Sequence, residues 1–80
     1  MTTLTIYSKP GCHLCDDMKA LVARVVQPLA GTVTVREVDI SGDAHLEAQY
    51  ALEIPVLLVD GKKAAKHRIT EEALSRILAS

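Results

Sequence analysis

The feature that most constrains this chain is the position of its two cysteines, Cys12 and Cys15, between segments with different apolar patterns. Residues 4–7 alternate and contain β-branched and aromatic side chains, which predicts a strand. After Cys15, spacings of three and four predict a helix with one buried face, formed by Met18, Leu21, Val22, Val25, Val26 and Leu29. We therefore expect both thiols in the first turn of a helix that follows a strand.

The spacing of the two cysteines suits a disulfide that closes and reopens. Residues three apart on a helix lie roughly 5–6 Å from each other, and a disulfide needs Cα atoms about 4.4–6.8 Å apart. A helix N-terminus favours an anion, and the thiolate is the reactive form of cysteine. We predict Cys12 as the more acidic, more exposed attacking nucleophile and Cys15 as the shielded resolving thiol. Lys9 adds positive potential, whereas Asp16 and Asp17 oppose a nearby thiolate.

Length and composition predict one domain, residues 1–80, with an ordinary apolar core, because 49% of its 80 residues are apolar. A disulfide across three residues gains little from loop entropy, so the pair is not expected to be structural. The N-terminal segment has no basic region followed by a long apolar run, which argues against a secretory signal or a membrane span. A reducing cytoplasm is the expected location. A net charge of −1 argues against a general nucleic-acid binder.

The middle of the chain predicts a βαβ unit. The first helix should end near Gln27, because Pro28 disfavours helical geometry in the residue before it, and residues 29–31 complete the exit. Residues 32–40 carry alternating apolar side chains and predict a second strand. A strand, a crossover helix and a second strand form a right-handed unit with parallel strands. A short helix over residues 44–51 follows.

The C-terminal part predicts a hairpin and a last helix. Val56–Val59 is a continuous apolar run, typical of a strand buried on both faces. The pair Asp60-Gly61 predicts a two-residue turn into an antiparallel strand over residues 63–67. Its lysines suit an edge strand protected from other chains, and Thr70 is placed to cap a final helix. The expected fold is a four-stranded mixed α/β sheet with three helices in the order β-α-β-α-β-β-α.

A Cys-x-x-Cys that opens the helix of a βαβ pattern is typical of a thioredoxin-like redox motif. Over nearly its whole length the chain resembles the thioredoxin superfamily and is most similar to small glutaredoxin-like proteins. The resemblance rests on residues 7–15 and on Glu53-Ile54-Pro55-Val56, and it implies a thioredoxin fold with a cis Ile54–Pro55 bond. It also implies contacts with substrate from the backbone of Ile54 and from the neighbouring segment. The implied substrate-binding residues are Tyr7, Lys9, Gly11, His13, Leu14, Ile54 and Pro55.

The chain departs from the classical glutaredoxin pattern in two places. His13 and Leu14 stand between the cysteines where those proteins have Pro-Tyr. Residues 66–70 replace the Gly-Gly-x-Asp stretch that holds glutathione. Lys9 matches a lysine that helps to hold a glutathione carboxylate in that family. A protein disulfide is therefore expected as substrate at least as much as glutathione.

Together these observations predict a dithiol–disulfide oxidoreductase. Cys12 attacks a substrate disulfide, and Cys15 then resolves the mixed disulfide and releases the reduced product. No organic cofactor or metal is expected. The expected partners are a disulfide-containing protein and an electron donor, either glutathione or a thioredoxin-reductase-like protein. We expect a monomer that binds neither nucleic acid nor membrane.

Several alternatives remain open. The two thiolates also suit a soft-metal carrier for Cu(I) or zinc, although a tetrahedral zinc site would need two further ligands, and His45 and His67 each lack a second ligand nearby. A redox-regulated binding domain without turnover is a third reading. His13 is either a solvated side chain or one that tunes the Cys12 thiolate. The basic run over residues 62–68 is either a solvated edge strand or a docking patch for an acidic partner.

Overall fold

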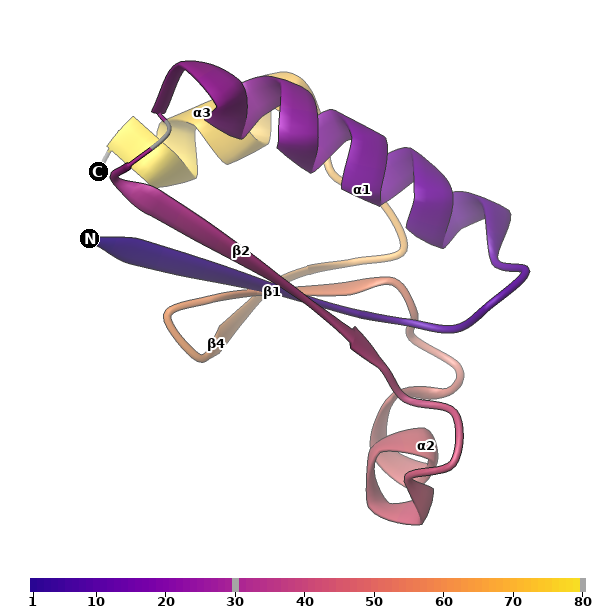
Figure 1. Cartoon of the computed structure of the whole chain (residues 1–80). Helices are drawn as coiled ribbons and strands as arrows, with labels where there is room; N and C mark the ends of the chain where they lie inside the picture. Colours follow the sequence, from indigo (N-terminus) through magenta and orange to yellow (C-terminus); the bar gives the residue numbers. More distant parts are fainter. Residues whose placement is uncertain (30, 80) are drawn as a thin grey trace.

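The computed structural model describes residues 1–29 and 31–79. These residues form four strands in one sheet and three α-helices (Figure 1). In chain order the elements are β1 (Thr2–Ser8), α1 (His13–Val26), the 3₁₀ turn η1 (Gln27–Leu29), β2 (Val33–Asp39), α2 (Ala44–Tyr50), β3 (Val56–Val59), β4 (Lys62–Lys66) and α3 (Glu71–Ala79). The order β-α-β-α-β-β-α and the mixed sheet agree with the prediction.

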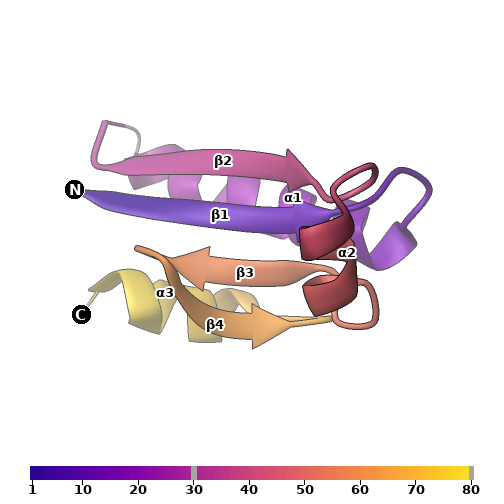
Figure 2. The same ribbon diagram turned by 90° about the horizontal axis from the view of Figure 1, so that it is seen from below.

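The strands lie side by side in the order β2-β1-β3-β4 (Figure 2). β1 and β2 are parallel, with Ser8 opposite Asp39. β3 runs antiparallel to β1, with Val56 opposite Tyr7, and β4 runs antiparallel to β3. The lysine-rich β4 is thus an edge strand, as predicted. The register also brings the start of β3 to the end of β1, where the cysteine segment begins.

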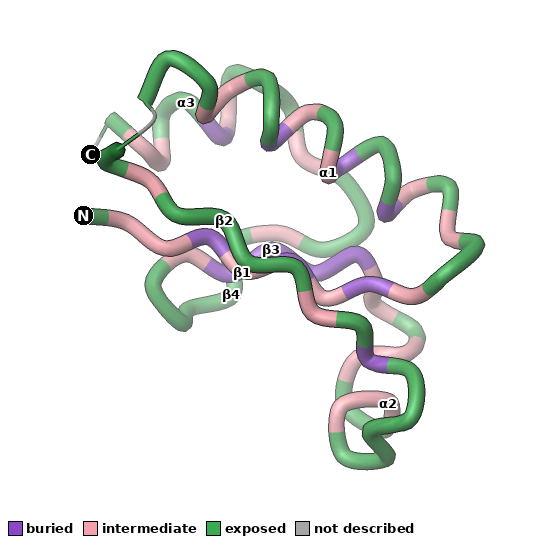
Figure 3. The backbone as a smooth tube through the Cα atoms, in the orientation of Figure 1, coloured by how far each residue is buried: buried purple, intermediate pink, exposed green. Residues whose placement is uncertain are grey.

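The main core lies between the sheet and two helices, because α1 and α3 cover one face (Figure 1). The alternation along β1 buries every second side chain toward this layer, and buried positions gather where α1 faces the central strands (Figure 3). The core cluster comprises Leu4, Ile6, Met18, Val22, Leu57 and Leu74. The short α2 lies on the other side of the sheet, near the ends of β1 and β2 (Figures 1 and 2).

The turn between β3 and β4 has the predicted form. Asp60 and Gly61 have φ angles of 50° and 87°, as a two-residue hairpin turn with two left-handed positions requires. The Asp60 side chain also accepts a hydrogen bond of 2.8 Å from the Thr3 backbone N–H. β3 is central, and Val56, Leu57 and Leu58 are all buried, which confirms the expectation of a strand buried on both faces.

Several element boundaries differ by one or two residues from the sequence predictions. α1 ends at Val26, and its chain continues as a 3₁₀ turn that includes Pro28. Gln27 keeps right-handed geometry, with its backbone N–H bonded to the Ala23 carbonyl, so the proline changes the helix type without stopping the turn. His67, predicted as the last residue of the edge strand, lies outside β4. Ala30, part of the predicted helix exit, lies outside the described residues.

No helix in the described part of the chain is long and apolar enough to span a bilayer.

Candidate functional site

The cysteine segment follows directly from the end of β1. Gly11 has a φ of +78°, a left-handed conformation that glycine adopts at little cost. This geometry reverses the chain after Pro10 and leaves Cys12 in an extended conformation as the N-cap of α1. The predicted position of the first thiol at a helix start is therefore correct.

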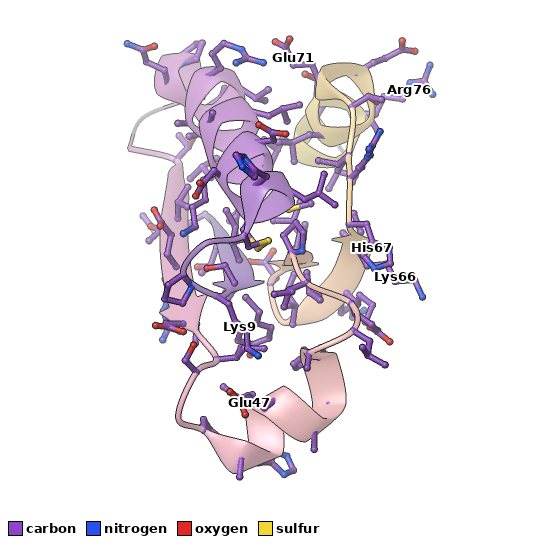
Figure 4. All side chains as sticks on the ribbon, turned by 90° about the vertical axis from the view of Figure 1, so that its right-hand side faces the viewer. Lys9, Glu47, Lys66, His67, Glu71 and Arg76 are labelled. Carbon is purple, nitrogen blue, oxygen red and sulfur yellow. A yellow bond between two sulfur atoms is a disulfide. The ribbon has the colours of Figure 1, made fainter. Side chains whose placement is uncertain are left out.

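A disulfide joins Cys12 and Cys15, whose Cα atoms are 5.2 Å apart, and its sulfur atoms lie at the start of α1 (Figure 4). The Sγ of Cys12 accepts a hydrogen bond of 3.1 Å from the Cys15 backbone N–H. Cys12 is half-buried, whereas Cys15 is 0% exposed. The predicted difference in exposure is confirmed, and solvent reaches the bond from the Cys12 side.

The Ile54–Pro55 bond is cis, as the resemblance implied. Pro55 is buried and immediately precedes β3, and the pairing of Val56 with Tyr7 brings it to the end of the sheet from which the cysteine segment leaves. The Ile54 backbone N–H donates to the Tyr50 carbonyl at 3.1 Å. Within residues 1–29 and 31–79 the Ile54 carbonyl accepts no hydrogen bond. Of the two backbone groups of Ile54, the carbonyl is therefore the one left for an extended ligand.

Lys9 and Tyr7 both contact α2. The Lys9 Nζ lies 3.7 Å from a Glu47 carboxylate oxygen, and Figure 4 shows the two side chains facing each other. The ring of Tyr7 stacks on that of Tyr50, with centroids 4.7 Å apart and planes at 27°. The Nζ of Lys63 lies 5.8 Å from the Tyr50 centroid. These contacts fasten α2 to the end of the sheet that carries the cysteines, a role the sequence did not reveal.

A depression of about 270 Å³ opens beside the first turn of α1. Leu14, the residue between His13 and Cys15, reaches it, so the depression begins close to the disulfide. Its lining is apolar except for one acidic and two basic side chains, and comprises Leu14, Asp17, Met18, Leu21, His67, Arg68 and Ile69. His13 is exposed as the first residue of α1. Leu14, which was predicted to bind substrate, thus lines a concave surface.

Sequence reasoning missed His67, which joins two loops beside this depression. Its backbone N–H donates to the Pro55 carbonyl at 2.7 Å. Its ring Nε2 lies 3.1 Å from the Leu52 carbonyl oxygen. The only signal in the sequence is that a bulky residue occupies the region where glutaredoxins have glycines.

Two carboxylates near this end of the sheet are electrostatically stabilised. A hydrogen bond from the Lys63 side chain, 2.6 Å long, lowers the pKa of Glu53, and the positive charges of Lys63, Lys66 and His67 act in the same direction. Hydrogen bonds from Ser41 lower the pKa of Asp39. The lowered pKa favours the ionised form of Glu53, and its contact with Lys63 ties the loop before Pro55 to β4.

In the described part of the chain, no three histidine, cysteine or acidic side chains gather in a way that would hold a metal ion. Among these residues, Cys12 and Cys15 therefore have no third histidine, cysteine or acidic side chain placed to share a metal ion with them.

A comparison with protein families matches residues 3–79 to the glutaredoxin-like domain (DUF836). The chain belongs to this glutaredoxin-like family. It is 29% identical over 75 residues to a glutaredoxin-like protein of Dictyostelium discoideum, the YDR286C homolog, covering 89% of this chain and 69% of that protein. The family explains the paired cysteines and supports a redox-type thiol function for this glutaredoxin-like chain.

Solved structures agree with this assignment. The chain is similar to protein XcR50 of X. campestris, with 32% identity, 95% of each chain covered and a TM-score of 0.75. It is also similar to protein Ne2328 of Nitrosomonas europaea, with 27% identity, a TM-score of 0.74, and 95% of this chain and 89% of that one covered. A malaria-parasite thioredoxin-2 shares the fold at 13% identity, with a TM-score of 0.73 over 99% of this chain and 82% of that one. The expected thioredoxin fold is confirmed.

Proposed function

We propose that this glutaredoxin-like protein is a dithiol–disulfide oxidoreductase that reduces disulfides in proteins or small molecules. The observation that carries the proposal is the disulfide at the start of α1, in which Cys12 is half-buried and Cys15 is fully buried. Because an incoming disulfide reaches Cys12 before Cys15, Cys12 is the attacking thiol and Cys15 is the resolving thiol. The proposed location is the cytoplasm, where free thiols are maintained.

In the first step the Cys12 thiolate attacks one sulfur of the substrate disulfide. The substrate S–S bond breaks, a bond between Cys12 and the substrate forms, and the departing thiolate takes a proton from water. The Cys15 backbone N–H, which already donates to the Cys12 Sγ, would stabilise the attacking thiolate, since a hydrogen bond to the charged form favours that form. The start of the helix acts in the same direction.

In the second step the Cys15 thiolate attacks the Cys12 sulfur. The mixed disulfide breaks, the second substrate thiolate leaves, and the Cys12–Cys15 bond of the structure forms. Two electrons have then passed from the protein to the substrate. Glutathione or a thioredoxin-reductase-like protein supplies two electrons to restore the dithiol, and the cycle needs no metal or organic cofactor.

A trapping experiment tests the proposal. The reduced Cys15→Ser variant, mixed with a disulfide-containing peptide, should accumulate a covalent adduct at Cys12 that mass spectrometry detects and dithiothreitol releases. Cys12→Ser is the matched control and should form no adduct. Turnover of the same peptide by the wild type, with glutathione or thioredoxin reductase and NADPH, completes the test. Stable Cu(I) or zinc binding without any turnover would instead favour a metal carrier, and the absence of both adduct and turnover would favour a binding domain.

A further inference from the structure

The turn between β4 and α3 holds His67 in an unfavourable backbone conformation. Its φ is +67°, and the Arg68 N–H donates to the Lys66 carbonyl at 2.7 Å across it. A hydrogen bond between residues two apart around a positive φ defines the rarer and more strained form of the γ-turn. Glycine would adopt this conformation at little cost, so a histidine here lowers stability unless its side chain compensates.

The other non-glycine residue with a positive φ has a simple explanation. Asp60, with φ 50°, is the first residue of a two-residue hairpin turn in which both positions must be left-handed. His67 lies between a strand and a helix, where no hairpin imposes this geometry. Backbone strain of this kind persists where surrounding contacts fix it, and it concentrates at functional sites. The contacts of His67 therefore indicate what the strain supports.

Those contacts all lead to the loop that carries the cis proline. The backbone N–H of His67 bonds to the Pro55 carbonyl, and its ring Nε2 lies 3.1 Å from the Leu52 carbonyl. A carbonyl oxygen only accepts, so Nε2 carries a proton and donates, as it does in the neutral Nε2–H tautomer and in the imidazolium ion. Leu52 itself is 93% exposed. The Leu52 side chain therefore does not anchor this loop, and the ring of His67 adds a restraint to the one that Glu53 makes with Lys63.

The restrained loop borders the surface that an extended substrate would meet. Ile54 lies between the two carbonyls that His67 binds, and its own carbonyl accepts no hydrogen bond from the described residues. His67 also lines the depression that Leu14 reaches beside the disulfide. His67 thus contacts the loop that carries Ile54 on both sides of that residue and also forms part of the wall of the depression.

We propose that His67 is a positioning residue that holds the Ile54–Pro55 edge in line with Cys12, and that it thereby favours peptide and protein disulfides over small ones. The inference rests on the proposed oxidoreductase function and adds a substrate class to it. A peptide that extends past its disulfide touches this edge and the depression, whereas a small disulfide engages chiefly the sulfur atoms. Loss of the ring should therefore affect the peptide more.

The test compares two replacements of His67. In His67→Gly the ring contact is lost while the positive φ becomes easy, so the variant should unfold at the same or a higher denaturant concentration than the wild type. Its kcat/KM for insulin, relative to that for bis(2-hydroxyethyl) disulfide, should fall by about threefold to tenfold, the loss expected for one hydrogen bond. The fall should appear mainly in KM. His67→Gln retains a donor at similar reach and should restore part of the preference.

Asp60→Gly is the matched control. It also replaces a non-glycine residue at positive φ and removes one side-chain hydrogen bond to a backbone group, the one to Thr3, but at the opposite end of β3. Its preference between the two substrates should equal that of the wild type. An unchanged preference in His67→Gly, or an equal loss for both substrates, would overturn the positioning role. A wild type that turns over neither substrate would overturn the proposed function itself.

Discussion

Replacing Tyr50 by alanine tests how α2 is held on the sheet. The helix has only seven residues, and none of them is fully buried. Its main attachment is the stack between Tyr50 and Tyr7, with centroids 4.7 Å apart, to which Lys63 adds a cation 5.8 Å from the Tyr50 ring. Without the ring, α2 keeps the exposed ion pair between Glu47 and Lys9, which contributes little in water.

The expected loss follows from these contacts. An aromatic pair contributes about 0.5–1.5 kcal/mol beyond burial, and an exposed cation–π contact about 0.5–1 kcal/mol. Removing a half-buried aromatic side chain costs about 1 kcal/mol more, half of the value for full burial. Tyr50→Ala should therefore lower the free energy of unfolding by about 2–3.5 kcal/mol. With a urea dependence of about 1 kcal/mol per molar for a small domain, the midpoint should fall by about 2–3.5 M.

Equilibrium unfolding in urea, followed by circular dichroism, measures this loss. Tyr50→Phe is the matched control, because it retains the ring and should unfold within about 0.5 kcal/mol of the wild type. A double-mutant cycle with Tyr7→Ala should give a coupling energy of about 0.5–1.5 kcal/mol. A loss below about 0.5 kcal/mol in Tyr50→Ala, or no coupling between the two rings, would refute the view that the stack fastens α2.

Three further predictions concern the core, the turn and acid stability. Leu74→Ala removes a fully buried side chain between α3 and α1 and should cost about 2–5 kcal/mol in thermal unfolding; a loss under about 1 kcal/mol would contradict the packing described. Gly11→Ala meets no atom within 4 Å, so it should cost only the left-handed penalty of about 1–2 kcal/mol, and an unaltered unfolding midpoint would show that the turn tolerates a side chain. Lys63 lowers the pKa of Glu53 on folding, so the ionised carboxylate stabilises the folded protein. This contribution to stability is fully present above the unfolded pKa of Glu53, about 4.3, and is lost as the pH falls through its folded pKa. Lys63→Met should therefore lose less stability than the wild type between neutral and acid pH, and equal losses would exclude this source.

Local pattern was sufficient for most of the fold. Apolar spacing predicted α1 because one face of that helix must be buried, and a continuous apolar run predicted β3 because the strand is central. Asp60-Gly61 predicted the hairpin because few residues accept two left-handed positions. These predictions succeeded because each depends on residues close together in the chain.

The site was predicted only where it depends on neighbouring residues. The exposure of Cys12 and burial of Cys15 follow from their places on one helix turn. The bond from His67 to Leu52 joins residues 15 positions apart, and the contact of Lys9 with Glu47 joins the loop after β1 to α2. Such pairs depend on how α2 and the turn before α3 meet the sheet, which no local spacing specifies. The cis bond before Pro55 was predicted from the family resemblance alone.

The burial of Cys15 has a kinetic consequence. Under the proposed function, a thiol that reopens the Cys12–Cys15 bond must approach the half-buried Cys12, because Cys15 is fully buried, and a substrate disulfide must approach the same residue. Reductant and oxidant would then react at the same sulfur atom, one after the other. Steady-state rates should follow a double-displacement pattern, with parallel lines in double-reciprocal plots when either reactant is varied.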